Sequence, residues 1–219
     1  CVILILAEIL LKKPDAQTQL PEAKSGKAVK GEDFERMDYT SRQMLLRPSF
    51  WMAFICISFL AAVGSSVISF AKDLALSVEA TTALATTLVG VLSVFNGIGR
   101  ILTGAVYDSL GRKTTMLASN ILTIFAAGLT LVSVQMNSLT LCIIGLCLTG
   151  LSYGSCPTMT SAFTASFYGA KYFPTNYSLT NFNLIVASFI ATFSNSLLIS
   201  TGSYTAPFVM LLILAVGAL

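Results

Sequence analysis

Residues 96–113 read NGIGRILTGAVYDSLGRK, and they place one permanently charged side chain, Arg100, within a long apolar run. Apart from Arg100, every residue from Thr86 to Tyr107 is apolar, small or neutral. A run of this length is typical of a helix that crosses a membrane, where an arginine is costly unless it faces a partner or a watery cavity. The stretch therefore predicts a membrane-spanning helix that carries a paired or functional cation.

The composition of the whole chain also indicates a membrane protein. Of its 219 residues 55% are hydrophobic and 11% are charged, and the mean hydropathy is +0.80. Since a spanning helix needs about 20 mostly apolar residues, the sequence predicts five complete spans. They lie at about residues 50–71, 82–107, 114–134, 139–167 and 177–200. Two shorter apolar runs, at residues 1–11 and 206–219, are interpreted as parts of two further helices, so we expect an internal fragment of a longer protein.

The positions of the cations predict the orientation in the membrane. If segment 12–48 is cytoplasmic, eleven of the 13 Lys and Arg residues lie inside, Lys72 lies outside and Arg100 lies in the membrane. This is the bias of the positive-inside rule. A nucleic-acid partner is not expected, because the eight cations of segment 12–48 alternate with six acids.

Several kinds of chemistry are not expected from this sequence. The five cysteines lie in apolar runs without CxxC spacing, and histidine is absent. Metal sites and Ser-His catalysis depend on such residues. We therefore expect neither an enzyme nor a metal or other cofactor.

The polar residues of two predicted helices share one face each. On a helical wheel, Arg100 lies on an arc with Asn96 and other polar or small residues, opposite an apolar arc. In the 177–200 span, Asn183 lies on a similar polar arc, which predicts either a cavity lining or hydrogen bonds between helices. Tyr153 is a polar aromatic residue that could reach a ligand. Arg100 could pair with Asp108, or its five-donor guanidinium could bind a small carboxylate bidentately.

The residues after Arg100 form a second motif. Gly104, Asp108, Gly111, Arg112 and Lys113 give the pattern G-x-x-x-D-x-x-G-R-K. This pattern resembles the short cytoplasmic loop motif of the major facilitator superfamily, in its copy between helices 8 and 9. Physically, Gly104 lets a neighbouring helix approach, Gly111 permits a tight turn, and Asp108 can contact a helix N-terminus or Arg112. The resemblance implies that this cluster stabilises one conformation of an alternating-access cycle.

Further strings resemble the oxalate/formate antiporter family and its monocarboxylate-transporter relatives. They are Asp38-Tyr39-Thr40, Asn96-Gly97-Ile98-Gly99-Arg100, Phe167-Tyr168-Gly169-Ala170-Lys171 and Asn176-Tyr177. The resemblance implies that Arg100 binds the substrate carboxylate. The oxalate carriers have a lysine on helix 11 where this chain has Leu184, and proton-coupled monocarboxylate carriers have an acid where it has Val89. A monocarboxylate is therefore expected rather than a dicarboxylate.

Together these observations predict an all-α integral membrane chain, the C-terminal six-helix bundle of a major facilitator transporter. Residues 1–11 are expected to be the end of helix 6, residues 12–48 the cytoplasmic linker between bundles, and residues 49–219 helices 7–12 with the last one truncated. The expected partners are the N-terminal six-helix half of the same protein, the lipid bilayer of the plasma membrane and a small carboxylate.

The expected function is secondary active transport of a small organic anion, a monocarboxylate of the lactate, pyruvate or formate type. Arg100, Asn96, Tyr153 and Asn183 are the expected substrate-binding residues. Two alternatives remain open at this point. One is a transporter-like membrane sensor or scaffold, and the other is a facilitator for an uncharged or cationic compound in which Arg100 is structural.

Overall fold

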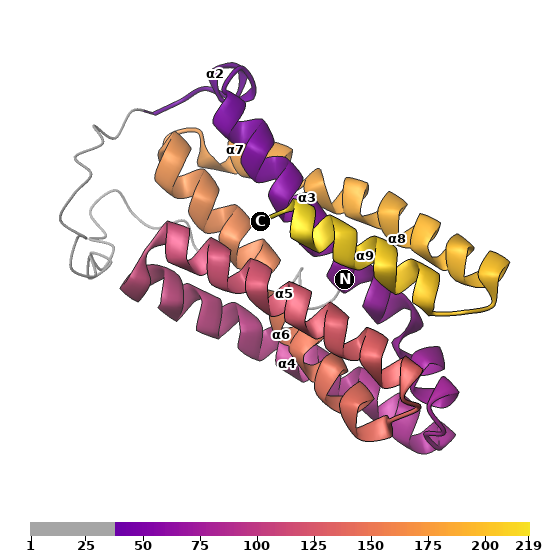
Figure 1. Cartoon of the computed structure of the whole chain (residues 1–219). Helices are drawn as coiled ribbons and strands as arrows, with labels where there is room; N and C mark the ends of the chain where they lie inside the picture. Colours follow the sequence, from indigo (N-terminus) through magenta and orange to yellow (C-terminus); the bar gives the residue numbers. More distant parts are fainter. Residues whose placement is uncertain (1–37) are drawn as a thin grey trace, which may run out of the picture. The chain divides into compact units, whose positions relative to one another are not determined.

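The computed structural model describes residues 38–219, and the regular elements in this part are all helices. They are α2 (Ser41–Leu45), α3 (Pro48–Ser77), α4 (Thr82–Leu110), α5 (Arg112–Gln135), α6 (Leu139–Tyr168), α7 (Phe173–Thr180), α8 (Asn183–Thr201) and α9 (Thr205–Gly217) (Figure 1). The predicted helix end at residues 1–11 and the predicted linker up to residue 37, with its cations, lie outside the described residues.

Five segments of this bundle are long and apolar enough to cross a membrane. They are Pro48–Ser77, Thr82–Leu110, Arg112–Gln135, Leu139–Tyr168 and Phe173–Thr201, and the shorter apolar helix Thr205–Gly217 follows them. The prediction of an all-α membrane chain with five complete spans is therefore confirmed. Helices are the expected solution in hydrocarbon, because each one satisfies its own backbone hydrogen bonds.

Helix α3 lies at the centre of the bundle. It contacts α4, α6, α8 and α9, and its buried Val67 and Leu74 belong to a core that includes Leu146 of α6 and Phe208 of α9. Pro48 occupies the first turn of α3, where its missing N–H costs no helical hydrogen bond. Helix α4 and the span that ends in α8 are the least buried of the five spans.

The contact between α4 and α6 is a seam of glycines. A Cβ atom added to Gly99 would overlap the carbonyl oxygen of Leu151, one on Gly150 would lie 2.6 Å from that of Leu92, and one on Gly154 would overlap that of Asn96. Small residues at a helix interface let the two backbones approach closely. The seam therefore holds α4 and α6 together through their backbones.

The fifth span is interrupted at residues 181–182, between α7 and α8. The Phe182 N–H donates to the Leu179 carbonyl (3.2 Å), and the Ile185 N–H donates to the Phe182 carbonyl (3.0 Å). These bonds to the residue three positions earlier give a tighter, 3₁₀-like turn than an α-helix. The sequence predicted one regular helix over residues 177–200, because a two-residue break leaves the spacing of its apolar residues unchanged.

The two ends of the bundle differ in charge. Apart from Arg100, the described cations at the end formed by α2, the turn at Gly111 and the turn at residues 169–172 are Arg42, Arg47, Arg112, Lys113 and Lys171. At the opposite end Lys72 is the single described cation. By the positive-inside rule, this difference predicts that the first end is cytoplasmic.

This orientation predicts the sidedness of two exposed lysine positions. In a background without the native cysteines, a cysteine at position 171 should react with an impermeant maleimide only from the cytoplasmic side. A cysteine at position 72 should react only from outside. External labelling at 171 together with none at 72 would reverse the orientation.

Candidate functional site

Arg100 projects from an exposed face of α4. The buried stripe of that helix consists of Ala85, Leu88, Leu92, Gly99 and Thr103. Arg100 is exposed together with the small or polar residues Ser93 and Gly97, while Val94 and Ile98 are among the exposed apolar residues of a separate arc. Eight residues separate Arg100 from Asp108, about 12 Å at 1.5 Å per residue. The charge therefore lies well within the span, on a polar face rather than the apolar one.

The guanidinium of Arg100 has no partner in the part of the chain that the structure describes. Within residues 38–219, no carboxylate oxygen lies within 4.0 Å of it and no hydrogen bond of its side chain is found. The alternative of an ion pair with Asp108 is thus not formed here. A buried or lipid-facing arginine without compensation is costly, so this face requires an anion or water beside it.

The glycine seam fixes the backbone that carries Arg100. A Cβ atom on Gly154 of α6 would lie 3.1 Å from the backbone nitrogen of Arg100 and would also overlap the carbonyl oxygen of Asn96. The hydroxyl of Thr158, also on α6, donates to the Arg100 carbonyl at 3.4 Å. These contacts fix the backbone of Arg100, from which the guanidinium extends.

Asn96 and Tyr153 both lie next to this seam. The Asn96 side-chain oxygen is buried and has no hydrogen-bond partner among the described residues. The Tyr153 ring packs against Gly64 of α3, and its hydroxyl accepts from the Ser65 hydroxyl at 3.5 Å. Tyr153 is adjacent in sequence to Gly154, so the seam brings Asn96, Arg100 and the Tyr153 backbone into one region.

Asn183 lies apart from this region, in the first turn of α8. It is only 2% exposed, and its amide nitrogen donates to the Thr160 hydroxyl of α6 at 3.2 Å. One turn earlier, the Thr164 hydroxyl donates to that of Thr180 at 3.2 Å. The other residues of the predicted polar arc of this span are buried as well: Asn176, Thr180, Ala187, Ala191 and Ser194. This burial favours the alternative in which the arc supplies hydrogen bonds between helices.

A different polar stripe of α8 is exposed, and the sequence reasoning missed it. Ser188, Thr192 and Asn195 line a crevice of about 280 Å³ with Ser65 and Ser69 of α3. Their spacing of four and three residues places them on one helix face. This spacing is visible in the sequence, but small hydroxyl residues are so common in helices that it gave no distinct signal.

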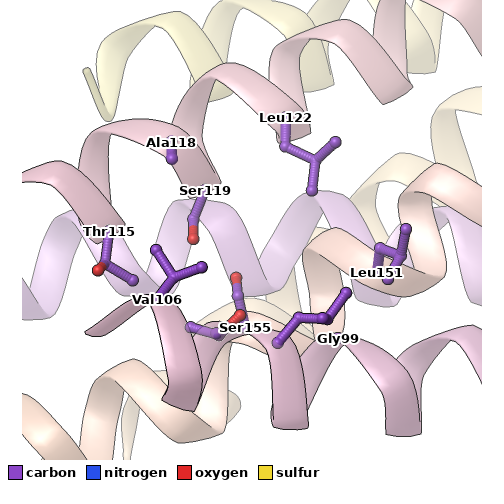
Figure 2. Close-up of a pocket in the computed structure, with 10 residues that line it drawn as sticks. Gly99, Val106, Thr115, Ala118, Ser119, Leu122, Leu151 and Ser155 are labelled. Atoms are coloured by element: carbon purple, nitrogen blue, oxygen red, sulfur yellow. The ribbon is translucent and has the colours of Figure 1, made fainter. Parts of the chain in front are cut away.

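A second cavity, of about 160 Å³, lies between α4, α5 and α6 (Figure 2). Its lining is Gly99, Leu102, Thr103, Val106, Thr115, Ala118, Ser119, Leu122, Leu151 and Ser155. None of these residues is charged, and none is an expected substrate-binding residue. The cavity is therefore unsuited to an anion, and the candidate site remains the face around Arg100.

The loop motif forms the turn between α4 and α5. Gly111 has φ = 78°, in the region that favours glycine, and it ends α4 and begins α5. The Arg112 guanidinium lies 4.0 Å from the centre of the Phe167 ring of α6 rather than on Asp108. Asp108 and Lys113 are exposed. Gly111 thus provides the expected tight turn, while of the two contacts considered for Asp108, the one with Arg112 is not formed within the described residues.

The close approach expected at Gly104 is not present. An added Cβ atom there would meet only the Thr158 Cγ2 atom, at 3.9 Å, which is an ordinary contact. The tight contact of α4 with α6 lies at Gly99, deeper in the span, and Gly104 has space around it.

Two segments that are distant in the sequence meet at the cation-rich end of the bundle: residues 38–41 contact residues 168–176, and we call this contact the clasp. The Tyr39 N–H donates to the Tyr168 carbonyl (3.0 Å), the Lys171 N–H to the Asp38 carboxylate (3.2 Å), the Asn176 amide to the Tyr39 carbonyl (2.9 Å), and the Ser41 hydroxyl to the Asn176 side-chain oxygen (2.8 Å). The clasp therefore attaches the segment before α3 to the turn between α6 and α7.

Asn176 is the centre of the clasp. It is fully buried and forms hydrogen bonds with two residues of the segment before α3, Tyr39 and Ser41. Asn176→Leu removes both bonds, and a hydrogen bond of this kind typically contributes about 0.5–1.5 kcal/mol to stability. We expect a lower melting temperature and faster proteolysis near residue 41. Ser178→Ala, at an exposed position of the same helix, should change neither. Equal behaviour of the two variants would contradict the clasp.

The comparison with known families agrees with this architecture. The model of the Major Facilitator Superfamily matches residues 50–219, which cover nearly all of α3 and the whole of α4 to α9. The chain belongs to the Major Facilitator Superfamily. A search of curated proteins finds no match.

Proposed function

We propose that this Major Facilitator Superfamily chain is part of a secondary active transporter for a small monocarboxylate and that Arg100 binds the carboxylate. The observation that carries the proposal is an exposed arginine at membrane depth, on a polar helix face, without an ion pair among the described residues. A planar guanidinium binds a carboxylate through two parallel hydrogen bonds. Asn96 and Tyr153, on either side of the glycine seam, are proposed to contact the substrate beside it.

The charge count of the spans supports a single anionic group on the substrate. Arg100 is the one cation at membrane depth among the described residues, since Lys72 lies near the end of α3. A second carboxylate would lack a cation and would cost desolvation energy. The resemblance to oxalate/formate and monocarboxylate carriers supports acids such as lactate, pyruvate and formate.

The exposed polar faces of α4 and α8 support a proposal about the rest of the protein. Inverted or parallel repeats of transporters place the substrate site between two bundles. We propose that an N-terminal six-helix half covers these faces, that residues 1–11 end its last helix, and that residues 12–48 are a cytoplasmic linker to the bundle at residues 49–219. The proposed membrane is the plasma membrane.

The loop motif is proposed to control the conformational balance, through Gly104, Asp108, Gly111, Arg112 and Lys113. Asp108 and Lys113 are exposed at the turn, where they are available to a facing bundle. Asp108→Asn should change the transport rate while leaving equilibrium binding within a few-fold, with a coupling of about 1–3 kcal/mol. Rates would be measured in proteoliposomes and binding by calorimetry. Loss of binding with an unchanged transport cycle would contradict the assignment.

The proposal is tested by flux through the intact protein in proteoliposomes. Radiolabelled lactate, pyruvate and formate are offered, with each acid or its neutral amide as competitor. We expect uptake that the acid inhibits and the amide does not. A sensor or scaffold would be stabilised by the acid without any exchange. A facilitator for an uncharged or cationic compound would be insensitive to the acid.

A further inference from the structure

We propose that the cavity between α4, α5 and α6 binds a neutral amphiphile from the membrane, an apolar ring or short chain that carries one hydroxyl group. The cavity has a volume of about 160 Å³ and no charged residue in its lining (Figure 2). This site is independent of Arg100 and of the carboxylate proposed to bind there, so it goes beyond the proposed function.

The mouth of the cavity opens on the side of α4 that is opposite to Arg100. The exposed lining residues are Leu102 of α4 and Ala118 of α5. On a helical wheel, Leu102 lies about 160° from Arg100. Leu102 is eight residues before Leu110, the end of α4, or about 12 Å along the helix axis. The mouth therefore lies well within the span and away from the polar face.

The surface around this mouth is apolar. On α4, one turn before Leu102, Ile98 is 39% exposed, and on α5 Ile121 and Phe125 are 55% and 60% exposed. The spacing of Ala118, Ile121 and Phe125 places all three on one face of α5. Large exposed apolar side chains at this depth are typical of a surface that contacts lipid. A ligand thus reaches the cavity from hydrocarbon rather than from water.

Two buried hydroxyl groups of the lining have no hydrogen-bond partner in the part of the chain that the structure describes. Thr103 of α4 is 8% exposed and Ser119 of α5 is 7% exposed, and no hydrogen bond of either side chain is found within residues 38–219. Figure 2 shows the Ser119 oxygen pointing from its helix into the space bounded by Val106 and Ser155. A buried hydroxyl without a partner is costly, so both groups favour a ligand that carries a polar atom.

The other two hydroxyl groups of the lining already donate their protons. Thr115 donates to the Gly111 carbonyl (2.8 Å) and Ser155 donates to the Ser152 carbonyl (2.6 Å), so both remain available only as acceptors. A hydroxyl group on a ligand can both donate and accept. An alcohol or a phenol therefore matches this lining, whereas a plain hydrocarbon chain would leave the two free hydroxyl groups unpaired.

The volume of the cavity sets the size of the buried part of the ligand. An apolar cavity of about 150 Å³ takes up one benzene molecule and stays free of water. Apolar side chains such as Leu102, Leu122 and Leu151 form much of the lining here, which disfavours filling by water alone. The cavity thus fits one six-membered ring, or a chain of similar size, with its hydroxyl group directed at Thr103 or Ser119.

The experiment measures the binding of para-fluorophenol and fluorobenzene to the intact, full-length protein in nanodiscs by fluorine NMR. Empty nanodiscs give the reference for uptake by lipid. We expect para-fluorophenol to bind the protein about fivefold more tightly than fluorobenzene, since one net hydrogen bond supplies such a factor. Arg100→Ala should leave both affinities unchanged, which separates this site from the anion site.

Variants of the two free hydroxyl groups locate the preference for the phenol. Thr103→Val and Ser119→Ala should each reduce it while leaving fluorobenzene binding nearly unchanged. Ser133→Ala is the matched control and should keep the full preference. Ser133 is the other buried serine of α5, its hydroxyl donates to the Thr130 carbonyl (2.7 Å), and it lies outside the cavity.

Closing the cavity tests whether the two probes bind inside it. Ala118→Phe places a large ring at the mouth and should abolish the binding of both probes. Ala83→Phe is the control, because Ala83 is an exposed alanine near the start of α4 and lies outside the cavity. It should bind both probes as the wild type does.

Three results would overturn the proposed site. The first is that neither probe binds beyond the uptake by empty nanodiscs. The second is that binding survives in Ala118→Phe, since the probes then lie elsewhere. The third is that the phenol has no advantage over fluorobenzene, or keeps its advantage in both hydroxyl variants, which would exclude a ligand held by Thr103 and Ser119.

Discussion

Replacing Arg100 with alanine is expected to abolish carboxylate binding in an otherwise folded protein. The side chain is exposed and forms no ion pair within residues 38–219, so its loss leaves no described acid unpaired. Stability should therefore change little, while the one cation that can hold the anion is gone. Arg100→Lys keeps the positive charge but loses the planar guanidinium that binds a carboxylate through two hydrogen bonds, so carboxylate binding should weaken sharply.

The measurement is ligand-induced thermal stabilisation by lactate and by lactamide, on wild type and both variants. Arg42→Ala, at an exposed arginine outside the spans, is the control and should behave as wild type. A large loss of expression and melting temperature in Arg100→Ala would indicate a structural ion pair with a residue beyond the described part. Carboxylate-specific stabilisation that survives in Arg100→Ala would falsify the anion site.

Gly154→Ala is expected to have the second large effect, on both stability and binding. Its added Cβ atom would overlap the Asn96 carbonyl oxygen and lie 3.1 Å from the backbone nitrogen of Arg100. Backbone atoms of two packed helices cannot move aside as a side chain can. Overpacking of this kind costs about 1–3 kcal/mol. Because α4 must shift to relieve it, the guanidinium is displaced and carboxylate affinity should fall more than the stability loss alone explains.

Gly90→Ala is the matched control for this prediction, because Gly90 lies on α4 with no atom within 4 Å of an added Cβ. It should be neutral or slightly stabilising, since alanine has the higher helix propensity. Melting temperature and lactate affinity would be measured for both variants. If Gly154→Ala retains wild-type affinity, the backbone seam does not position Arg100.

The spans could be predicted from the sequence for a simple physical reason. Long apolar runs fix the number of membrane helices, and a single charge in such a run must lie on a polar face. The wheel of α4 predicted that the arc of Arg100 faces inward, whereas the stripe buried within the described residues is Ala85, Leu88, Leu92, Gly99 and Thr103 and Arg100 is exposed. The start of α5 could be predicted because the Gly111 turn has few alternatives.

Whether the polar arc of α8 is buried or exposed could not be predicted in the same way. Helical periodicity shows that Asn183 and Ser194 share a face, but it does not show whether another helix covers that face. The structure covers it with α6 and α3 and exposes Ser188, Thr192 and Asn195 instead. Which face is buried depends on the packing of distant segments, and a local pattern does not contain this information.

The contacts of the clasp could not be predicted from the sequence either. Asp38 and Asn176 were singled out only through a resemblance, because pairing between residues so far apart follows from the course of the whole chain. Gly169 illustrates the point, since its φ of 79° is predictable for a turn glycine, but its contact with the Asp38 carboxylate is not.

The break at residues 181–182 divides the fifth span into two parts with different attachments. The short part, α7, is tied to the segment before α3 through Asn176 and to α6 through Thr180. The long part, α8, carries the crevice and is anchored at its start by the bond from Asn183 to Thr160. A helix bends most easily where its regular hydrogen bonds are interrupted. The interruption therefore gives this span a hinge beside Asn183, so that a change in the packing of α8 need not be transmitted to α7 and the segment before α3.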